Sequence, residues 1–384
     1  MGVEWGGMQR ELPRLRDIEI LFRPFVSRKL RLPTRVVMAP MTRSFAPGGE
    51  PTAEMAAYYW RRAVHELGLI ITEGVIIDDP AASADANCPH FFGGSALRAW
   101  KSICRAVHST PCKIAPQLWH VGMARPVAGD VPFPEFPPIG PSGIDPVTLQ
   151  RTGETMSRRR IAAVVEAYAQ AAADARKLGF DAVEIHGAHG YLIDQFLWAA
   201  TNKRTDEYGG DLIGRTRFAR EVVQAVRKAV GSRFPIIFRL SQWKVGHYDA
   251  RLAQDPRELA DLLQPLCEAG VDIFHCSTRR FDRPEFTGSG LNLAGWVKKL
   301  TGRPTIAVGS VGLDREFSAE ALRTPAASAP GTLARLAEMM GAGEFDLIAV
   351  GRALLADPAW ATKIRYSAED SIIPFSKQSL SRLF

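Results

Sequence analysis

Eight short runs rich in Val, Ile and Phe recur along the chain, and stretches with a helical spacing of apolar residues lie between them. The runs lie at residues 35–40, 68–77, 112–120, 180–187, 234–241, 271–277, 304–310 and 345–352. The stretches at 159–180 and 256–272 predict helices most clearly, and each has near its end a glycine that suits a helix C-cap. Strand and helix alternating in this way predict an α/β protein with a (β/α)₈ TIM barrel.

A doubly wound sheet is the main competing fold. It rarely repeats strand and helix so evenly, and it usually opens with a glycine-rich first turn that this chain lacks. We therefore expect a single barrel domain over residues 1–384. Three segments add to it, namely an N-terminal arm at 1–34, a proline-rich segment at 121–156 and a C-terminal tail at 353–384.

The proline-rich segment is too long for a simple connection between a strand and a helix. It follows the third predicted strand, at the end of the barrel where catalysis takes place. We predict that it forms an inserted lid or subdomain over the active face. The stretch 323–331 has the composition of a surface linker before the last helix.

The formal net charge of +7 and the pI near 9.3 allow weak attraction to anions, but the basic residues are scattered. Only SRRRI, at 157–161, is a tight basic run, and we interpret it as the solvated start of a helix rather than a nucleic-acid patch. The five cysteines are an odd number and include no CxxC pair. This argues against a disulfide framework and against a cysteine-ligated zinc or iron–sulfur site.

The first 15 residues lack the apolar core of a signal peptide, and no apolar run reaches the roughly 18 residues that a spanning helix needs. The cysteine pattern suits a reducing compartment. We therefore expect a cytoplasmic protein with neither a membrane nor a nucleic-acid partner.

Polar residues and glycines stand at the C-terminal ends of the predicted strands, where side chains in a barrel point toward the catalytic mouth. In chain order they are Thr42, Glu73, Gly74, Gln117, His186, His189, Arg239, Gly309, Ser310, Gly351 and Arg352. So many polar positions at one end of a barrel are hard to attribute to packing, and they predict an active site there.

The stretch DAVEIHGAHGYLIDQF, at 181–196, holds two histidines three residues apart with glycines beside them. Alternation along the strand places Glu184 and His186 on the face toward the barrel interior and Ile185 on the face toward the helices. A metal, a substrate oxygen and packing are the candidates for what the histidine pair holds. A zinc site would need a third ligand and usually an HExxH-like context, neither of which the sequence offers, so we expect no metal.

For the remaining polar positions, a structural role and a functional role are both open interpretations. Gln117 and Arg239 would be costly to bury alone, so each needs a hydrogen-bonding ligand or an ion pair. Glu73 and Glu184 are expected to satisfy neighbouring charges. The glycines that end the seventh and eighth strands are typical of loops that hold a phosphate, to which Arg352 would add a charge-assisted contact.

Six short motifs stand in a definite order along the chain: APMTR (39–43), ITEG (71–74), QLWHVG (117–122), EIHGAHGYLIDQFL (184–197), RTDEYGG (204–210) and VGR (350–352). In this order and spacing, over nearly the whole chain, they resemble the old yellow enzyme family of FMN-dependent ene-reductases. The resemblance implies the same barrel with FMN at its C-terminal mouth and with NADH or NADPH as the reductant.

The resemblance also implies a role for each matching residue. Those assigned to FMN are Ala39, Pro40, Met41, Thr42, Gly74, Gln117, Arg239, Gly309, Ser310, Gly351 and Arg352. Among them, Thr42 and Gln117 would contact the polar edge of the flavin, Gly74 would contact it through the backbone, Arg239 would face its N1 and C2 carbonyl, and the last four would hold the phosphate. His186 and His189 would clamp the carbonyl oxygen of the substrate, and Tyr191 would donate a proton.

In such an enzyme, reduced flavin delivers hydride from N5 to the β-carbon of an alkene conjugated to a carbonyl or nitro group. Negative charge builds on the substrate oxygen, where two imidazole N–H donors would stabilise it. A tyrosine, with an ordinary pKa of about 10, keeps its proton at neutral pH and can protonate the α-carbon. The predicted partners are therefore small activated alkenes and a nicotinamide, and a homo-oligomer is among the assembly states that the sequence allows.

Two positions depart from the common pattern of the family. Met123 stands where many members have an arginine after QLWHVG, and we expect this change to alter the substrate pocket. Gly214 replaces a frequent asparagine, and we expect an effect on helix capping only.

Two other functions are alternatives to the ene-reductase hypothesis. The first is a non-redox barrel aldolase or isomerase, with Lys244 as a Schiff-base lysine just beyond the fifth strand. The second is a flavin-binding protein without turnover. The histidine pair followed by Tyr191 argues against the second, and the combination of Gln117, Arg239 and the phosphate loops argues against the first.

Overall fold

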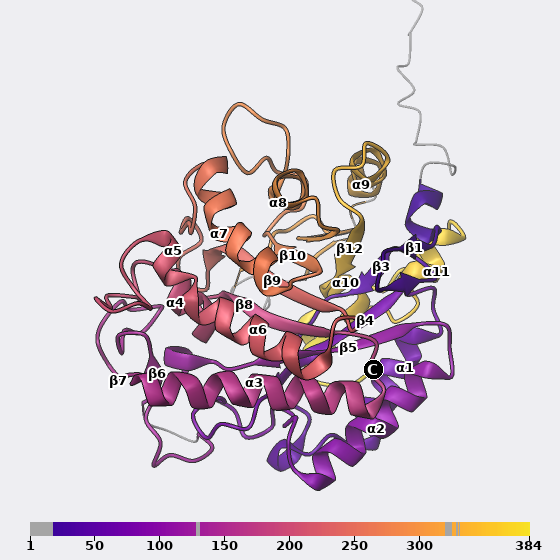
Figure 1. The fold of residues 1–384 in the computed structure, drawn as a ribbon. Coiled ribbons are helices and arrows are strands. Elements are labelled where there is room, and N and C mark those ends of the chain that lie inside the picture. Colours follow the sequence, from indigo (N-terminus) through magenta and orange to yellow (C-terminus); the bar gives the residue numbers. More distant parts are fainter. Residues whose placement is uncertain (1–17, 128–130, 319–324, 328, 330) are drawn as a thin grey trace, which may run out of the picture.

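Eight parallel strands close into a barrel (Figure 1) in the computed structural model, which describes residues 18–127, 131–318, 325–327, 329 and 331–384. Around the barrel the strands follow the order β10-β11-β12-β3-β4-β5-β8-β9. They are β3 (Val36–Met38), β4 (Leu69–Ile76), β5 (Lys113–Trp119), β8 (Val183–His189), β9 (Ile236–Lys244), β10 (Ile273–Ser277), β11 (Thr305–Val308) and β12 (Leu347–Val350). Each predicted apolar run contains one of these strands, apart from differences at the ends, so the predicted (β/α)₈ fold is confirmed.

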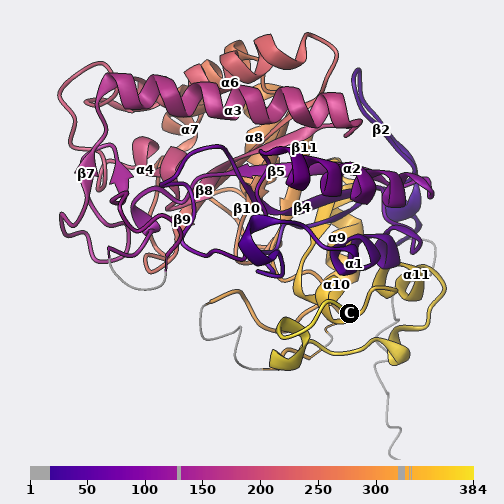
Figure 2. The same ribbon diagram turned by 90° about the horizontal axis from the view of Figure 1, so that it is seen from below.

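Helices surround the strands and cover the outer surface of the barrel (Figure 2). They are α1 (Ala53–Ala63), α2 (Gly94–His108), α3 (Arg158–Leu178), α4 (Leu192–Leu197), α5 (Leu212–Arg215), α6 (Arg217–Val230), α7 (Pro256–Ala269), α8 (Leu293–Thr301), α9 (Gly331–Gly341), α10 (Arg352–Ala356) and α11 (Trp360–Arg365). The two stretches with the clearest helical period form α3 and α7.

The ends of α3 and α7 follow from local sequence. Ser157 caps α3 by accepting a hydrogen bond from the Arg160 backbone N–H, so the basic run does begin a helix. Both helices end at a glycine in the left-handed conformation, with φ of 95° at Gly179 and 117° at Gly270. Residues with a Cβ rarely adopt this conformation, so the predicted C-cap glycines are confirmed.

The strands present apolar residues to the lower barrel interior and polar residues near its mouth. An interior cluster includes Leu69, Ala115 and Ala182. Gln117 and Glu184 lie two residues beyond Ala115 and Ala182, on the same face of their strands, and both are buried. Ile185 points the other way and belongs to the cluster shared with the helices, as the alternation predicted.

The described part of the N-terminal arm closes the barrel at the end opposite the mouth. A short hairpin of β1 (Phe25–Val26) and β2 (Arg31–Leu32) adds the side chains of Phe25, Leu30 and Leu32 to the interior cluster. Lys29 within it pairs with Asp272, just before β10, at 2.6 Å. This apolar plug leaves the C-terminal mouth as the end of the barrel where a ligand can enter.

The segment 121–156 contains β6 (Ile139–Gly140) and β7 (Glu154–Thr155), which pair in parallel. None of its described residues lines the cavity at the C-terminal mouth of the barrel. It borders the loops beside that cavity, because the His247 ring hydrogen-bonds the Val147 carbonyl at 2.8 Å. Its role as a lid stays a prediction.

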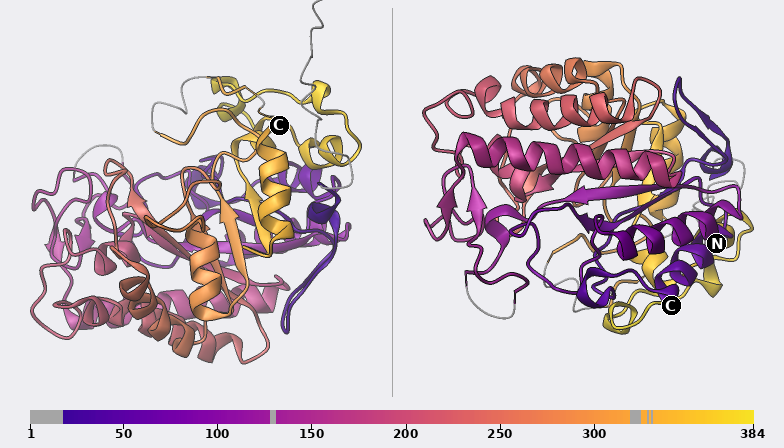
Figure 3. Two further views of the ribbon diagram at one scale, coloured as in Figure 1. Left: turned by 90° about the horizontal axis from the view of Figure 1, so that it is seen from above. Right: turned by 60° about the horizontal axis from the view of Figure 1, so that its bottom comes forward.

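The C-terminal tail lies beside N-terminal elements (Figure 3). The Arg43 Nη2 donates to the carbonyls of Ser379, Leu380 and Arg382, and Arg61 donates to the Leu383 carbonyl. The tail also contributes Leu355 and Leu380 to the wall of the cavity at the barrel mouth. It is therefore part of the site rather than a peripheral extension.

The predicted linker at 323–331 falls partly outside the described residues, at 323, 324, 328 and 330. Within its described part, the Ala326 N–H donates to the Phe375 carbonyl of the tail at 3.1 Å, and α9 begins at Gly331. Among the described helices, none is long and apolar enough to cross a membrane.

Candidate active site

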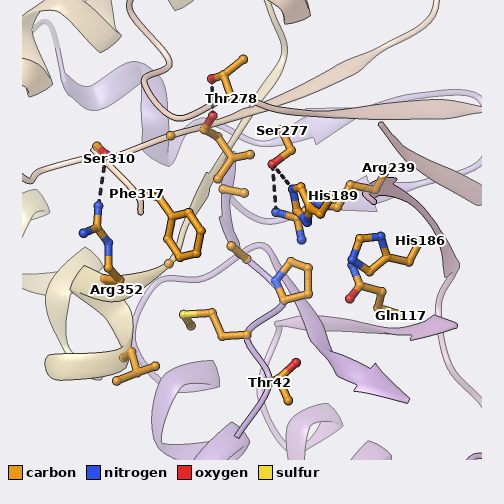
Figure 4. A pocket seen from close by; sticks show the side chains of 18 of the residues that line it. Thr42, Gln117, His186, His189, Arg239, Ser277, Thr278, Ser310, Phe317 and Arg352 are labelled. Carbon is orange, nitrogen blue, oxygen red and sulfur yellow. Dashed lines mark hydrogen bonds between the residues drawn. The ribbon is translucent and has the colours of Figure 1, made fainter. Parts of the chain in front are cut away.

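A cavity of about 350 Å³ lies at the C-terminal ends of the barrel strands (Figure 4). It is lined by every residue that the sequence analysis assigned to cofactor or substrate except Gly74: Ala39, Pro40, Met41, Thr42, Gln117, His186, His189, Tyr191, Arg239, Gly309, Ser310, Gly351 and Arg352. The closed barrel brings them together because the carboxyl ends of its parallel strands all meet at this mouth.

The two histidines stand on β8 with their rings 5.2 Å apart and at 89° to each other. His186 Nδ1 accepts a hydrogen bond from the Ala188 backbone N–H at 3.3 Å, so the ring proton is assigned to Nε2. His189 has a positive φ of 66°, and its Nε2 shares a hydrogen bond of 2.8 Å with the Ser277 hydroxyl. Each neutral ring can therefore offer one N–H donor.

Both imidazoles are neutral at physiological pH. Burial lowers the pKa of His186 and His189 well below the ordinary value of 6.5, and the nearby positive charge of Arg239 lowers both further. A neutral imidazole donates a hydrogen bond without bringing a full charge into the cavity. The pair is thus suited to an oxygen that gains negative charge only during a reaction.

Tyr191 follows the histidine pair and is the N-cap residue of α4. Its ring packs edge to face against Trp119, with centroids 4.9 Å apart, and against His186, at 5.1 Å. Burial raises the pKa of the Tyr191 phenol from 10.0 to about 12. The hydroxyl therefore holds its proton throughout the neutral range.

A buried polar network crosses the barrel below the histidines. The Gln117 Nε2 donates to one oxygen of Glu184 at 2.7 Å, and the other oxygen accepts from His275 Nδ1 at 2.7 Å. With both oxygens of Glu184 bound, the Gln117 side chain is held in one orientation beside the cavity. Glu184 thus satisfies neighbouring groups, as the sequence predicted.

Arg239 is buried in the cavity wall with few protein partners. Its Nη2 donates a long hydrogen bond of 3.4 Å to Ser277, and its Nε has no partner among the described residues. Burial lowers the pKa of this guanidinium, while the carboxylate of Glu184 opposes the shift. A buried guanidinium with an unpaired nitrogen is costly, which indicates a ligand that accepts hydrogen bonds.

The loops after β11 and β12 meet at the other end of the cavity (Figure 4). Arg352 Nη2 donates to the Ser310 hydroxyl at 3.1 Å, and Arg352 Nη1 has no partner among the described residues. Gly309 has a φ of 147°, and a Cβ there would lie 2.7 Å from the Thr278 carbonyl oxygen. A side chain at 309 would therefore push this loop away from the one after β10.

Comparisons with known proteins agree with this geometry. The model of the NADH:flavin oxidoreductase / NADH oxidase family matches residues 20–371. The chain is 33% identical over 377 residues to 12-oxophytodienoate reductase 7 of Oryza sativa subsp. japonica, covering 91% of this chain and 88% of that protein. It is 31% identical over 343 residues to NADPH dehydrogenase of Bacillus subtilis (strain 168), covering 89% and 93%. This chain belongs to that family, the old yellow enzyme family.

Other relatives are longer, and a solved structure shares the fold. The chain is 30% identical to NADH oxidase of Thermoanaerobacter brockii, covering 88% of this chain but only 49% of that protein. The structure of morphinone reductase in complex with tetrahydroNAD superposes with a TM-score of 0.76 at 28% identity, covering 94% of this chain and 93% of that chain. As an old yellow enzyme family member, the protein is an NAD(P)H-dependent oxidoreductase whose cofactor is FMN.

The residues of this old yellow enzyme cavity suit FMN chemically. The unpaired Arg239 Nε lies in the wall together with Gln117 and Thr42, where the carbonyls and ring nitrogens of an isoalloxazine could accept or donate hydrogen bonds. The unpaired Arg352 Nη1 lies at the opposite end beside Ser310, where a phosphate would satisfy it. Polar groups at both ends therefore match a ligand with a polar ring at one end and a phosphate at the other.

Arg352→Ala is expected to weaken FMN retention, because it removes a charged hydrogen bond worth roughly 1.5 to 3 kcal/mol. Chromatography of the cofactor released from the purified protein, together with the dissociation constant measured by flavin fluorescence, checks this. Arg335→Ala on α9, an exposed arginine away from the cavity, is the control. Unchanged retention in Arg352→Ala would mean that the backbone amides of the two loops hold the phosphate alone, and release of FAD would contradict the assigned cofactor.

Two of the sequence-based expectations fall on residues outside the cavity wall. Gly74 does not line the cavity, because it lies under the Trp119 indole, where a Cβ would come within 2.4 Å of the ring. Met123, expected to alter the substrate pocket, is fully buried in the 121–156 segment against Gly140 and Gly153 and does not reach the cavity. The Gly214 N–H donates to the Asp211 cap of α5 at 2.7 Å, and the expected effect of this position on helix capping only stays a prediction.

Lys244 is not available as a Schiff-base lysine. The strand β9 runs three residues further than the predicted run and ends at Lys244, so placing this residue past the strand was wrong. Its side chain is fully buried and forms an ion pair of 2.9 Å with Asp194, whose other oxygen accepts from the Gly190 N–H at 2.6 Å. The pair supports the loop between His189 and Tyr191 from behind and leaves no free amine in the cavity.

Sequence reasoning missed several cavity residues. Ser277 ends β10, and the rule that polar strand ends face the mouth would have found it had it been applied to the sixth strand. Trp243 lies in the unpredicted extension of β9, with its ring 4.5 Å from His189. Phe317 and Leu380 come from a loop and from the tail, where no pattern in the sequence signals them.

Proposed function

We propose that the protein is an ene-reductase, which uses NADH or NADPH to reduce the C=C bond of small alkenes conjugated to a carbonyl or nitro group. The observation that carries the proposal is one cavity wall formed by two neutral imidazoles and a protonated phenol. FMN, when bound, supplies the hydride chemistry for both the nicotinamide and the alkene. The remaining steps belong to side chains of this chain.

His186 and His189 donate N–H groups to the carbonyl or nitro oxygen of the substrate. Their perpendicular rings, 5.2 Å apart, can approach one oxygen from two directions. Since the rings are neutral, the interaction with the oxygen strengthens as negative charge develops there, which lowers the barrier rather than only binding the ground state. Removal of one such donor typically costs about 10²- to 10³-fold in kcat.

Tyr191 holds the proton that the α-carbon receives. The phenol is protonated at neutral pH because burial raises its pKa to about 12. Its ring is fixed by Trp119 and His186, and no hydrogen bond from a described residue competes for the hydroxyl proton. A positioned acid of this kind is commonly worth about 10² to 10⁴ in rate.

The two rival functions have less support. An aldolase or isomerase would need a reactive lysine, and Lys244 is buried in an ion pair with Asp194. A flavin-binding protein without turnover would not require two neutral imidazoles beside a phenol in the cavity that suits the flavin.

The proposal is tested by separating the two half-reactions under anaerobic conditions. NADH or NADPH should bleach the yellow holoprotein, and subsequent addition of 2-cyclohexenone, a maleimide or a nitroalkene should restore the colour and yield the saturated product. If none of these acceptors restores the colour after bleaching, the result would favour a flavin-binding protein without alkene turnover. An allylic alcohol as the product, from reduction of C=O, would contradict the proposed placement of the substrate oxygen.

A further inference from the structure

A second cavity, of about 310 Å³, lies beside the active-site cavity at the same end of the barrel. Its walls come from the ends of β9 and β10, from the loops that follow β9, β10 and β11, and from the start of α8. Trp243, Ser277 and Thr278 belong to the walls of both cavities. The two cavities therefore adjoin at these three residues, and a ligand that spans both would cross there.

The second cavity is rich in guanidinium groups. Four arginines line it: Arg251, Arg279, Arg280 and Arg283. The carboxylates in its described wall are those of Asp249, Glu285 and Glu316, so the arginines outnumber them. Planar guanidinium groups bind phosphate oxygens through paired hydrogen bonds, which makes such a wall suited to a phosphorylated ligand.

Arg283 is the arginine best placed to exchange its present partner for a ligand. Its side chain is 67% exposed, and its ion pair with Glu316 has a long distance of 3.6 Å. The same carboxylate is held more closely by Arg279, at 2.9 Å. An anion that enters this cavity can therefore contact Arg283 without breaking a close ion pair.

Aromatic rings stand next to the arginines. The Arg279 guanidinium lies 4.4 Å from the centre of the Tyr248 ring, and Tyr248 lies 6.0 Å from Trp243, in the shared wall. Flat rings beside guanidinium groups match a ligand that carries a planar base together with phosphates.

We propose that this second cavity binds the adenosine diphosphate half of NADH or NADPH while the nicotinamide ring lies in the active-site cavity. The inference rests on the proposed function, because it extends the site at which the reductant reacts. The small uncharged alkenes that the active site is proposed to reduce have no group that needs several guanidiniums. The phosphate of FMN is matched separately, by Ser310 and Arg352.

The test compares NADH with 1-benzyl-1,4-dihydronicotinamide, which donates the same hydride but lacks the adenosine diphosphate. Arg283→Glu in the FMN-loaded protein is expected to raise the KM for NADH about three- to tenfold, a modest factor because the side chain is exposed. The rate with the benzyl compound should stay unchanged. Arg158→Glu is the matched control, since Arg158 is 66% exposed, pairs with Glu207 and lies on α3 away from both cavities.

A binding measurement without turnover completes the test. ADP-ribose should bind to the holoprotein in calorimetry, compete with NADH but not with the benzyl compound, and bind more weakly to Arg283→Glu than to Arg158→Glu. Equal KM values for NADH in the two variants, or equal losses with both hydride donors, would overturn the proposed site. Failure of either donor to bleach the flavin of the unmodified protein would instead count against the proposed function.

Discussion

Replacing Tyr191 with phenylalanine is expected to slow the reduction of 2-cyclohexenone about 10²- to 10⁴-fold while leaving flavin reduction by NADH or NADPH nearly unchanged. Phenylalanine keeps the ring that packs on Trp119 and His186 and removes only the hydroxyl. Stopped-flow absorbance of the two half-reactions measures the two rates separately. Tyr168→Phe is the matched control, because Tyr168 is buried on α3, away from the cavity, with a hydroxyl that has no partner among the described residues.

The loss of alkene-reduction rate in Tyr191→Phe should depend on the substrate and not on pH. A nitroalkene gives a nitronate that is stable enough to be protonated later in water, so its reduction should slow far less than that of 2-cyclohexenone. In the unmodified protein the raised pKa of Tyr191, about 12, keeps the phenol protonated, so the enone rate should not fall as pH rises from about 6 to 9. Equal slowing of both half-reactions in Tyr191→Phe would make the hydroxyl a structural group of the flavin site.

The strands could be predicted because parallel barrel strands are buried on both faces and read as nearly continuous apolar runs. The same property explains the error at β9. Gln242 and Lys244 are polar, so an apolar criterion stops before them, yet both are buried. Their polar groups are satisfied internally, for example by the ion pair of Lys244 with Asp194, and no pattern along the chain reveals such partners.

The sequence predicted those site residues whose positions follow from strand periodicity and motif spacing. His186 and Arg239 occupy paired positions on β8 and β9, so a correct strand assignment brings them together. Phe317 and Leu380 reach the cavity through the path of a loop and of the tail, which only tertiary contacts determine. Position 74 does require a glycine, but the structure gives packing as the reason. The register of β4 and β5 places Gly74 under the Trp119 indole and outside the cavity wall.

The Met123 expectation failed for a similar reason. A motif aligns residues along the chain, but the backbone after β5 enters η3 (Gly122–Ala124), where the Met123 N–H donates to Gln195 Oε1 at 3.0 Å. This places the side chain among Gly140 and Gly153 of the inserted segment. The position therefore shapes the packing of 121–156 rather than the wall of the cavity.

Removing either imidazole is expected to weaken the binding of phenol to the oxidised holoprotein by about 10- to 100-fold, with FMN still bound. A phenolate resembles the oxygen anion that the proposed reaction forms, and a hydrogen bond to a charged group is worth about 1.5 to 3 kcal/mol. The change of the flavin absorption spectrum on titration with phenol gives the dissociation constant for His186→Ala, for His189→Ala and for the double variant. The same variants should reduce 2-cyclohexenone about 10²- to 10³-fold more slowly.

His189→Asn separates the donor from the ring. His189 has a φ of 66°, a left-handed conformation that asparagine tolerates better than most residues, and the asparagine amide keeps an N–H donor. We therefore expect His189→Asn to retain most of the phenol affinity that His189→Ala loses, although it gives up the contact with the Trp243 ring. If asparagine were no better than alanine, the ring packing of His189 would be what matters, and unaltered phenol binding in the double alanine variant would remove the oxygen clamp from the proposed mechanism altogether.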